Sequence, residues 1–419
     1  MRRYSRVARR AEGWYQSGAR DAGKEAKEGC GCARFGGAWR LSWRDYASHD
    51  RIADFARDLH GHDLAGSILA VAAPELRNLN DFTLADLEGI RMLLRGGSVV
   101  DWHRLNFAGE AEVRNFVAAQ EVDLDDPKDQ ARVSQIKEAA IEYLRRHFDF
   151  PVPKPVAKKD LVGLLMLASS KGHRQICACA ILKVMHIIHH LEARELMFLL
   201  PVADEEIFHL VEHKVYQVMG AALANDFPIL EFIGGRKNKD SLYTKLLSKP
   251  DVSASQIYDK VRFRIVTRSA EDVFPVLNYI QRSVVPFNFI IPGQSTNTLL
   301  RFHEYCRSEP ALNELVASLQ LPLDLEDGLS SIDNRFTAPS YRVVHFVADV
   351  PVRIPQHVLE AAASATANLG RIIFVQTEFQ VIDRATDQTN ESGDASHENY
   401  KERQKLAVMH RLKVGGLSK

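Results

Sequence analysis

The spacing of apolar residues changes near residue 226, and that change limits the folds open to this chain. From about 48 to 228, apolar residues recur every three or four positions, as on the buried face of a helix. Beyond it, three runs alternate apolar with polar residues and are rich in β-branched and aromatic side chains: KVRFRIVT, YRVVHFVAD and RIIFVQTEFQVI. Helical segments separate these runs. The pattern predicts an α+β fold, with an N-terminal all-helical region followed by a mixed β-sheet domain flanked by helices.

The same change divides the chain into three parts. Residues 1–47 are rich in Arg, Gly and Ala, and we expect them to form a basic, disordered tail. Residues 48–228 form a helical domain of unknown role. Three prolines interrupt it at 149–160, because proline cannot continue a helix. Residues 229–419 form the sheet domain.

Composition excludes several classes of protein. Lys+Arg and Asp+Glu are equal at 54 each, so the chain as a whole does not attract nucleic acid by its charge. The five cysteines form no CxxC pair, which is typical of a reduced, cytoplasmic protein. No apolar run reaches the ~20 residues that a membrane span needs, and the basic N-terminus has no apolar stretch like that of a secretory signal. We therefore expect a cytoplasmic protein without a membrane partner.

Ordinary structure explains two groups of potential metal ligands. His186 and His190 lie four residues apart, as in zinc-binding helices, but Ile187 occupies the position of the general-base glutamate. The segment is also densely apolar, which favours a packed helix. The Cys-x-Cys pairs at 30–32 and 177–179 fall in the expected tail and on an apolar helix face, where a buried structural thiol is the simpler interpretation.

The segment GGRKNKDSLYTKLLSK, residues 234–249, has the composition of a phosphate site. Its two glycines end one element, basic residues follow, and Ser241 opens a helix that carries Lys245 one turn later. Positive charge at a helix start opposes the helix dipole, but an anionic ligand would reverse that sign. The alternative is a solvated basic turn. The chain has no glycine-rich Walker loop, which excludes a P-loop enzyme.

Two of the predicted strands add carboxylates and more positive charge. Asp259 leads KVRFRIVT, whose polar face carries Arg262 and Arg264. In RIIFVQTEFQVI, Glu378 and Gln380 share a polar face, which is typical either of a solvent-facing strand or of a strand that lines a site. Two carboxylates are the minimum for holding Mg²⁺ near a polyphosphate, and the basic residues supply the positive charge that phosphoryl chemistry needs.

In this order the motifs resemble those of the RelA/SpoT-type alarmone synthetase domain, which has a nucleotidyltransferase-like fold. The resemblance covers roughly residues 231–405. GRKNKDSLYTK is similar to the family's basic segment R-x-K-x-x-x-S-I-x-x-K, and YDKVRFRIV to its Asp-led strand D-x-x-A-x-R-(I/V). YRVVH is similar to Y-Q-S-(L/I)-H, and EFQVI to E-V-Q-I-R. GDASHENYK, at 393–401, resembles the family's closing pattern H-W-x-Y-K.

The resemblance implies a role for each matched residue. Asp259 would bind Mg²⁺ with help from Glu378, which would also take the proton from the acceptor's 3′-hydroxyl. The ATP-binding residues would be Lys237, Ser241, Lys245, Arg264 and Arg236, the last of which is one position out of register with the family's arginine. The acceptor-binding residues would be Tyr341, stacked on the acceptor base, with His345 and Gln380.

The implied reaction is a Mg²⁺-dependent transfer of pyrophosphate from ATP to a nucleotide, with release of AMP. GDP or GTP is the default acceptor, giving (p)ppGpp, the alarmone of the stringent response. Adenine nucleotides and the 3′ end of tRNA are alternatives, because RFTAPS replaces the family's P-K-x-N-G before Tyr341 and the chain carries an insert at about 288–338. The resemblance also allows a homo-oligomer.

Two other interpretations stay open. One is a catalytically degenerate protein that binds nucleotide or RNA and acts as a regulator. The other is a nucleotidyltransferase that moves AMP, which would need a Gly-Ser motif and a paired Asp-x-Asp, and neither is evident near Asp259. The helical region lacks the family's hydrolase pattern, so we assign it no alarmone hydrolysis.

Overall fold

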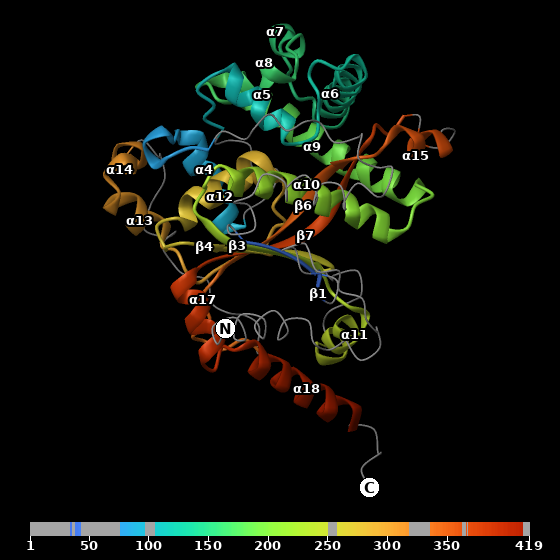
Figure 1. The fold of residues 1–419 in the computed structure, drawn as a ribbon. Coiled ribbons are helices and arrows are strands. Elements are labelled where there is room, and N and C mark those ends of the chain that lie inside the picture. The colour runs from blue at the N-terminus through green and yellow to red at the C-terminus, as the bar shows by residue number, and fades with distance from the viewer. Residues whose placement is uncertain are drawn as a thin grey trace.

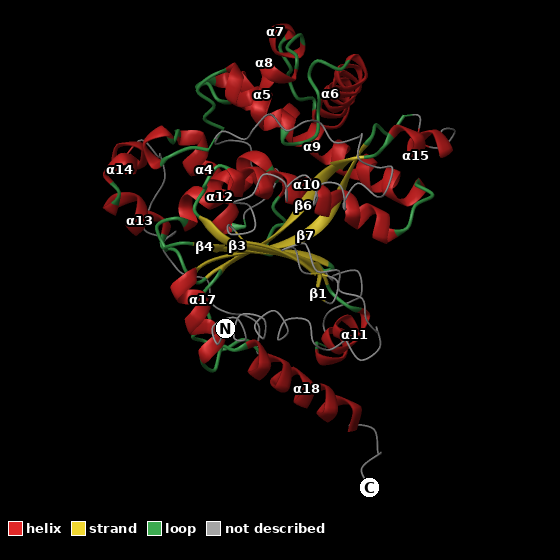
Figure 2. Ribbon diagram, in the orientation of Figure 1, coloured by secondary structure: helices red, strands yellow, loops and turns green. Residues whose placement is uncertain are grey.

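A seven-stranded sheet with helices on both faces forms the centre of the protein (Figures 1 and 2). The computed structural model describes residues 76–96, 105–249, 258–317, 336–362, 366 and 368–413, together with two short strands at 34–35 and 38–42. The strand order is β1-β2-β3-β4-β7-β6-β5. β4 and β7 are parallel and the other pairs are antiparallel, so the sheet is mixed and the predicted α+β class is confirmed.

The strands come from both ends of the chain. They are β1 Arg34–Phe35, β2 Ala38–Ser42, β3 Ile229–Arg236, β4 Val261–Thr267, β5 Thr296–Asn297, β6 Val344–Arg353 and β7 Ile372–Asp383. β4, β6 and β7 are the three runs predicted to be strands. β2 pairs antiparallel with β3, so the expectation of a disordered tail is wrong for these residues. The pairing satisfies backbone groups that an edge strand would leave open. The rest of 1–47 lies outside the described residues.

The helices follow the predicted periodicity. They are α4 Leu84–Arg95, α5 Glu110–Ala118, α6 Pro127–Phe148, α7 Lys154–Ala157, α8 Leu161–Ala168, α9 His173–Leu199, α10 Asp204–Ala224, α11 Lys239–Ser248, α12 Val273–Ser283, α13 Phe302–Ser308, α14 Pro310–Ala317, α15 Gln356–Ala361, α17 Arg384–Ser392 and α18 His397–Lys413. α4 shows why such segments start and stop where they do. The Thr83 hydroxyl accepts a hydrogen bond from the Asp86 backbone, and Gly96 ends the helix in the left-handed conformation, φ 59°.

The expected domain boundary at 228 does not coincide with a break between hydrophobic cores. One core joins α4, α10 and α12 to the sheet, although α4 and α10 precede the boundary. A second core joins α5, α6, α8 and α9, and it includes Phe289 and Phe374 from the sheet region. Periodicity marks where helices give way to strands, but packing decides which of them share a core. The predicted insert contains β5, α13 and α14, and its part at 318–335 lies outside the described residues.

Helix α9 is long and apolar enough to cross a membrane by length and composition alone. Its most apolar 18-residue window has a mean hydropathy of 1.4, contrary to the expectation that no segment of this kind exists. Of that window, 44% is buried inside the protein, and the core helices of soluble proteins have the same composition. The observation is therefore weak evidence for a membrane span.

Four stacked phenylalanines run across the buried face of the sheet. They are Phe232 on β3, Phe263 on β4, Phe379 on β7 and Phe346 on β6, with neighbouring ring centroids 5.2–5.6 Å apart. Tyr216 of α10 meets two of these rings edge-on, so this is the face that α10 covers. Successive side chains of a strand point to opposite faces, and the residues next to these phenylalanines therefore point away from α10.

We predict that Gly234→Ala lowers the free energy of unfolding by about 1–3 kcal/mol. An added Cβ would lie 2.5 Å from the Tyr216 hydroxyl and 2.6 Å from the Phe263 ring, both fully buried groups that cannot move aside freely. Denaturant titration of the purified protein measures the change. Gly109→Ala is the matched control, because its Cβ would meet nothing within 4 Å. Equal stability of the two variants would contradict the packing described for β3.

Candidate active site

Strand alternation and register place the predicted polar residues on the face of the sheet opposite α10. The parallel pairing of β4 with β7 sets Arg262 opposite Glu378 and Arg264 opposite Gln380. The antiparallel pairing of β6 with β7 sets His345 opposite Gln380. α11, α17 and α18 lie on this side of the sheet, while α10 and α12 lie on the other (Figure 1). Local sequence thus decides the face, and strand pairing decides the neighbours.

Asp259, just before β4, is buried between two lysines. The Lys237 Nζ lies 2.5 Å from its Oδ2, and the Lys245 Nζ lies 2.8 Å from its Oδ1. Lys237 follows the end of β3. Lys245 comes from α11, where the Ser241 backbone donates a hydrogen bond to the capping side chain of Asn238 at 2.8 Å. Ser241 precedes Lys245 by one turn and therefore shares its side of the helix.

The lysines keep the Asp259 carboxylate ionised. Burial raises its pKa, but the charges of Lys237 and Lys245 outweigh burial and hold the pKa below its ordinary value, against an opposing contribution from Glu378. Burial lowers the pKa of Lys237 despite the attraction of Asp259. Because Glu378 contributes to the pKa of Asp259, the two carboxylates lie within electrostatic range of each other.

Glu378, in the middle of β7, is also buried and ionised. Gln380 donates a hydrogen bond to its Oε1 at 2.6 Å, and the His345 Nε2 lies 3.4 Å from the same oxygen. Burial raises the pKa of Glu378. The hydrogen bond and charge of His345, with the charge of Arg262, outweigh burial and hold the pKa well below its usual range. Glu378 is therefore a fixed anion on the site face.

Arg264 and Tyr341 lie together, within electrostatic range of Glu378. Arg264 is buried and forms an ion pair with Asp387 in the first turn of α17. Tyr341 precedes β6, which begins three residues later than the predicted strand did. Burial raises the pKa of the Tyr341 hydroxyl, and the neighbouring Arg264 reduces that effect without cancelling it. The phenol therefore keeps its proton at neutral pH.

Arg236 does not join the site, so its assignment to ATP binding is not supported by the geometry. Its guanidinium is paired with the Glu212 carboxylate of α10 at 2.8 and 2.7 Å and lies over the Phe208 ring at 5.7 Å. As the last residue of β3, it points to the same face as Gly234, toward α10. Lys237, the next residue, points to the site. Arg236 was wrongly assigned to the site because strand β3, which sets the direction of its side chain, was not predicted.

Helix α18 places His397 and Lys401 near Arg262, and neither residue was assigned a role in binding from the sequence. Burial lowers the pKa of His397 to about 3, helped by the positive charges of Lys401 and Arg262. Burial also lowers the pKa of Lys401, again with a contribution from Arg262. His397 and Lys401 are four residues apart and share one side of the helix. The matched motif GDASHENYK contains both residues, and their i, i+4 spacing could have indicated from the sequence that they point the same way.

The two carboxylates fit Mg²⁺ only in company with a nucleotide. Asp259 and Glu378 offer the ionised oxygen ligands that Mg²⁺ prefers. Within the described residues there is no group of three or more His, Cys, Asp or Glu able to hold a metal by itself. Mg²⁺ is commonly held by one or two carboxylates plus substrate phosphates, and that is the arrangement these residues suit.

The histidines of α9 lie elsewhere. The His186 and His190 rings are 4.4 Å apart, and His190 stacks on Phe374 at 4.2 Å. The His190 Nε2 lies 3.2 Å from the Asp349 carboxylate. These contacts are those of a packed helix.

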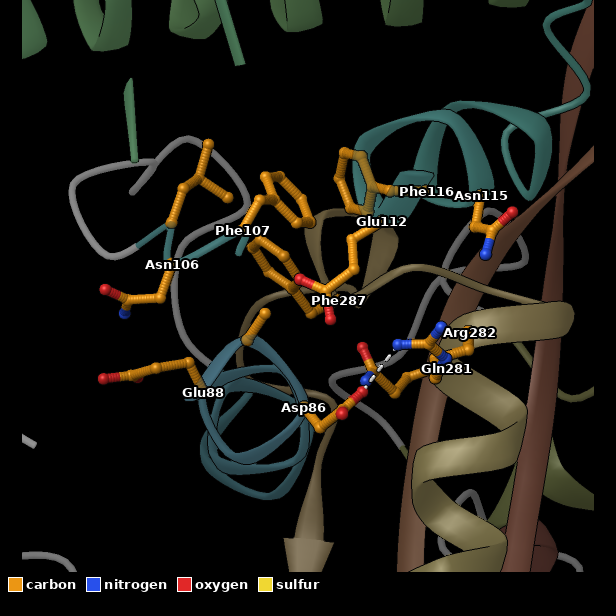
Figure 3. Close-up of a pocket in the computed structure, with 12 residues that line it drawn as sticks. Asp86, Glu88, Asn106, Phe107, Glu112, Asn115, Phe116, Gln281, Arg282 and Phe287 are labelled. Carbon is orange, nitrogen blue, oxygen red and sulfur yellow. Dashed lines mark hydrogen bonds and ion pairs between the residues drawn. The ribbon is translucent and has the colours of Figure 1, made fainter. Parts of the chain in front are cut away.

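A separate cavity lies between α4, α5 and α12, on the α10 side of the sheet (Figure 3). It has about 490 Å³ of space open to solvent, with Phe107, Phe116 and Phe287 gathered on one side. The Asp86 carboxylate in its wall is held by Arg282 at 2.9 Å, a contact drawn in Figure 3. Because it lies on the α10 side of the sheet, away from the face that carries Glu378 and Arg264, we assign it no part in the site.

Comparison with known proteins finds similarity among solved structures only. No family model matches the chain, and no curated protein matches it either. Small alarmone synthetase 2 from Bacillus subtilis is 14% identical, with a TM-score of 0.25 over 51% of this chain and 96% of its own. Small alarmone synthetase 1 from the same organism is 15% identical, with a TM-score of 0.26 over 49% and 85%. A second structure of synthetase 1, bound to its product pppGpp, is 15% identical with a TM-score of 0.25.

These similar chains are of the family that the motifs resemble. Their TM-scores are too low to carry any part of the functional argument, which rests on the geometry of the site.

Proposed function

We propose that this protein is a Mg²⁺-dependent ATP pyrophosphotransferase of the RelA/SpoT type. It would move the β,γ-pyrophosphate of ATP to the 3′-hydroxyl of a nucleotide acceptor, by default GDP or GTP, to give (p)ppGpp. One observation carries the proposal: two buried, ionised carboxylates share a sheet face with the basic side chains Lys237, Lys245, Arg262, Arg264 and Lys401. Positive charge of this density favours a polyphosphate, and paired carboxylates favour its metal ion.

In the proposed ATP complex, Lys237 and Lys245 exchange one anionic partner for another. Both form ion pairs with Asp259 in the structure. Moving to the ATP phosphates would leave the Asp259 oxygens free for Mg²⁺, with Glu378 beside them. When bound, Mg²⁺ would neutralise charge that builds up on the phosphate oxygens during transfer. Arg264 and Lys401 would add further charge along the triphosphate.

The transfer step needs the acceptor held in line with the donor. The acceptor's 3′-oxygen forms a bond to the β-phosphorus, the bond from that phosphorus to the oxygen bridging to the α-phosphorus breaks, and AMP leaves. Glu378 accepts the proton of the 3′-hydroxyl. A carboxylate with a lowered pKa is a weak base, so we expect the proton to move late, once the forming bond has made the hydroxyl acidic. His345 and Gln380 hold the carboxylate in place.

Tyr341→Ala should raise the KM for the acceptor by about 5- to 150-fold, because stacking of a base on an aromatic ring is worth about 1–3 kcal/mol. The KM for ATP should change little, since the ring is assigned to the acceptor base. Steady-state rates with each substrate varied in turn measure both constants. Tyr341→Phe keeps the ring and should stay close to wild type. Equal effects on both substrates would place Tyr341 outside the acceptor site.

A test of the whole proposal uses γ-labelled ATP, Mg²⁺ and a panel of acceptors. GDP, GTP, AMP, ADP and deacylated tRNA are offered in turn, which covers the adenine and tRNA alternatives. Label on one acceptor, with AMP released in equal amount, identifies that acceptor. No labelled product from any member of the panel would contradict catalysis by this chain under these conditions.

A second function has one observation in its favour. Both oxygens of Asp259 are already held by lysines, as expected of a site that binds nucleotide without a metal. A regulator of this kind would bind ATP and form no product. Its ATP affinity would survive Glu378→Gln, and the acceptor panel would stay unlabelled throughout.

A further inference from the structure

Helix α9 carries an exposed, mainly apolar stripe along about six of its turns, and Arg194 lies within it, with its guanidinium over the Phe198 ring at 5.9 Å. Ile176, Ile187, Leu191 and Phe198 are between 45% and 73% exposed. At 100° per residue they fall within an arc of about 60° on the helix surface. Residues on the opposite face, such as Leu182 and Met185, are buried in the second core. An apolar stripe of this length is unusual on the surface of a monomer and marks an interaction surface.

Three of the four apolar residues are placed symmetrically about Ile187, and the fourth, Leu191, would face Lys183 of the other copy. Ile176 and Phe198 each lie eleven residues from Ile187, a rise of about 16 Å in either direction. Two antiparallel copies of the helix, related by a two-fold axis at Ile187, would set Ile176 of each against Phe198 of the other. Ile187 would meet its own copy on the axis. A surface that matches itself in this way is what an isologous interface requires.

The charges at the two ends of α9 are opposite in sign. Exposed Lys171 and Arg174 lie at its N-terminal end, where positive charge opposes the helix dipole. Exposed Glu205 and Glu206 open α10, five residues beyond the C-terminal end of α9. Antiparallel pairing brings the basic end of one copy beside the acidic end of the other, twice by symmetry. Parallel pairing would set like charges together.

We propose that the α9 stripe is the interface between two copies of this chain, paired antiparallel about Ile187. The proposal does not depend on pyrophosphate transfer, and its tests measure assembly without any assay of activity. Lipid is the other occupant that the composition of α9 allows. Burial of nearly half of its apolar window against the protein argues against α9 leaving the core to enter a bilayer.

Sedimentation equilibrium of the full chain tests the interface. We expect the wild-type protein to be a dimer. Ile187→Asp and Phe198→Asp should each raise the dissociation constant by at least about 30-fold, as expected for residues at the centre of an interface. Leu412→Asp is the matched control, because Leu412 is 61% exposed on α18, which lies on the other side of the sheet from α9 (Figure 1), and should leave the dimer intact. Circular dichroism checks that each variant is folded.

Charge reversal tests the antiparallel arrangement itself. Arg174→Glu and Glu205→Lys should each weaken self-association, because each sets like charges opposite one another twice. An equimolar mixture of the two variants should form a heterodimer with near wild-type affinity, since every pair across the interface is then opposite in sign. Failure of the mixture to recover would overturn the antiparallel arrangement.

Three results would overturn the proposal as a whole. One is a wild-type chain that stays monomeric at every soluble concentration. Another is a dimer that Ile187→Asp and Phe198→Asp leave unchanged. The third is a monomer that floats with phosphatidylcholine vesicles and loses this binding in Ile187→Asp, which would identify lipid as the occupant of the stripe.

Discussion

Glu378→Gln is expected to lower kcat for pyrophosphate transfer by about 10²–10⁴-fold, the usual contribution of a positioned general base. Glutamine keeps the size of the side chain and can still accept the hydrogen bond from Gln380. It cannot accept the proton of the 3′-hydroxyl, and it removes one of the two anions of the site. ATP binding should persist, because Lys237, Lys245 and Arg264 remain. Release of AMP measures kcat, and calorimetry measures ATP affinity.

Gln376 provides the control for this change. It is exposed on the same strand, two residues before Glu378 and with the same orientation, so Gln376→Ala should leave kcat near wild type. A Glu378→Gln protein with kcat within a few-fold of wild type would remove Glu378 from the chemistry. An equal loss in both variants would indicate damage to β7 instead.

Asp259→Asn is expected to have an effect of similar size by a different route. Loss of a metal ligand should lower kcat by about 10³-fold, since the ion contributes several kcal/mol of transition-state stabilisation. A second effect, an increase in ATP affinity, is expected from the lysines. Without the Asp259 charge, Lys237 and Lys245 are free to pair with phosphate, so ATP measured in EDTA should bind the variant more tightly than it binds the wild type.

The two readouts for Asp259 separate its roles. Tighter metal-free ATP binding with lost turnover supports a carboxylate that holds Mg²⁺ and restrains the lysines. Unchanged turnover would contradict the metal assignment. Weaker metal-free binding would show that the lysines do not reach the ATP phosphates.

Much of the site could be predicted because strand alternation is local. The spacing of Arg262 and Arg264 around Phe263 sets their face without knowledge of the fold, and the same holds for Glu378 beside Phe379. Asp259 and the basic segment from 234 to 249 were assigned to the site from the order of the motifs along the chain. The structure brings them together through the pairing of β3, β4 and β7.

The errors arise where distant contacts decide. β3 was missed because Gly234 and Gly235 are typical of a turn, whereas here Gly234 leaves room for the Tyr216 hydroxyl and the Phe263 ring. Without that strand, the side to which Arg236 points could not be known. The helical region was set apart because its periodicity differs from that of the sheet, yet the buried Lys214 of α10 donates hydrogen bonds to Ala119 and to Pro351 of β6.

In the proposed reaction, pyrophosphate moves as one unit from ATP to the acceptor. The most direct measurement uses ATP labelled at both the β- and γ-phosphorus, with the acceptor that the panel identifies. We expect both labels to reach the acceptor in equal amounts, with one AMP released for each pyrophosphate transferred, and Glu378→Gln to stop the transfer of both. Label from the γ-phosphorus alone with release of ADP, or AMP attached to the acceptor with free pyrophosphate, would contradict the proposed reaction.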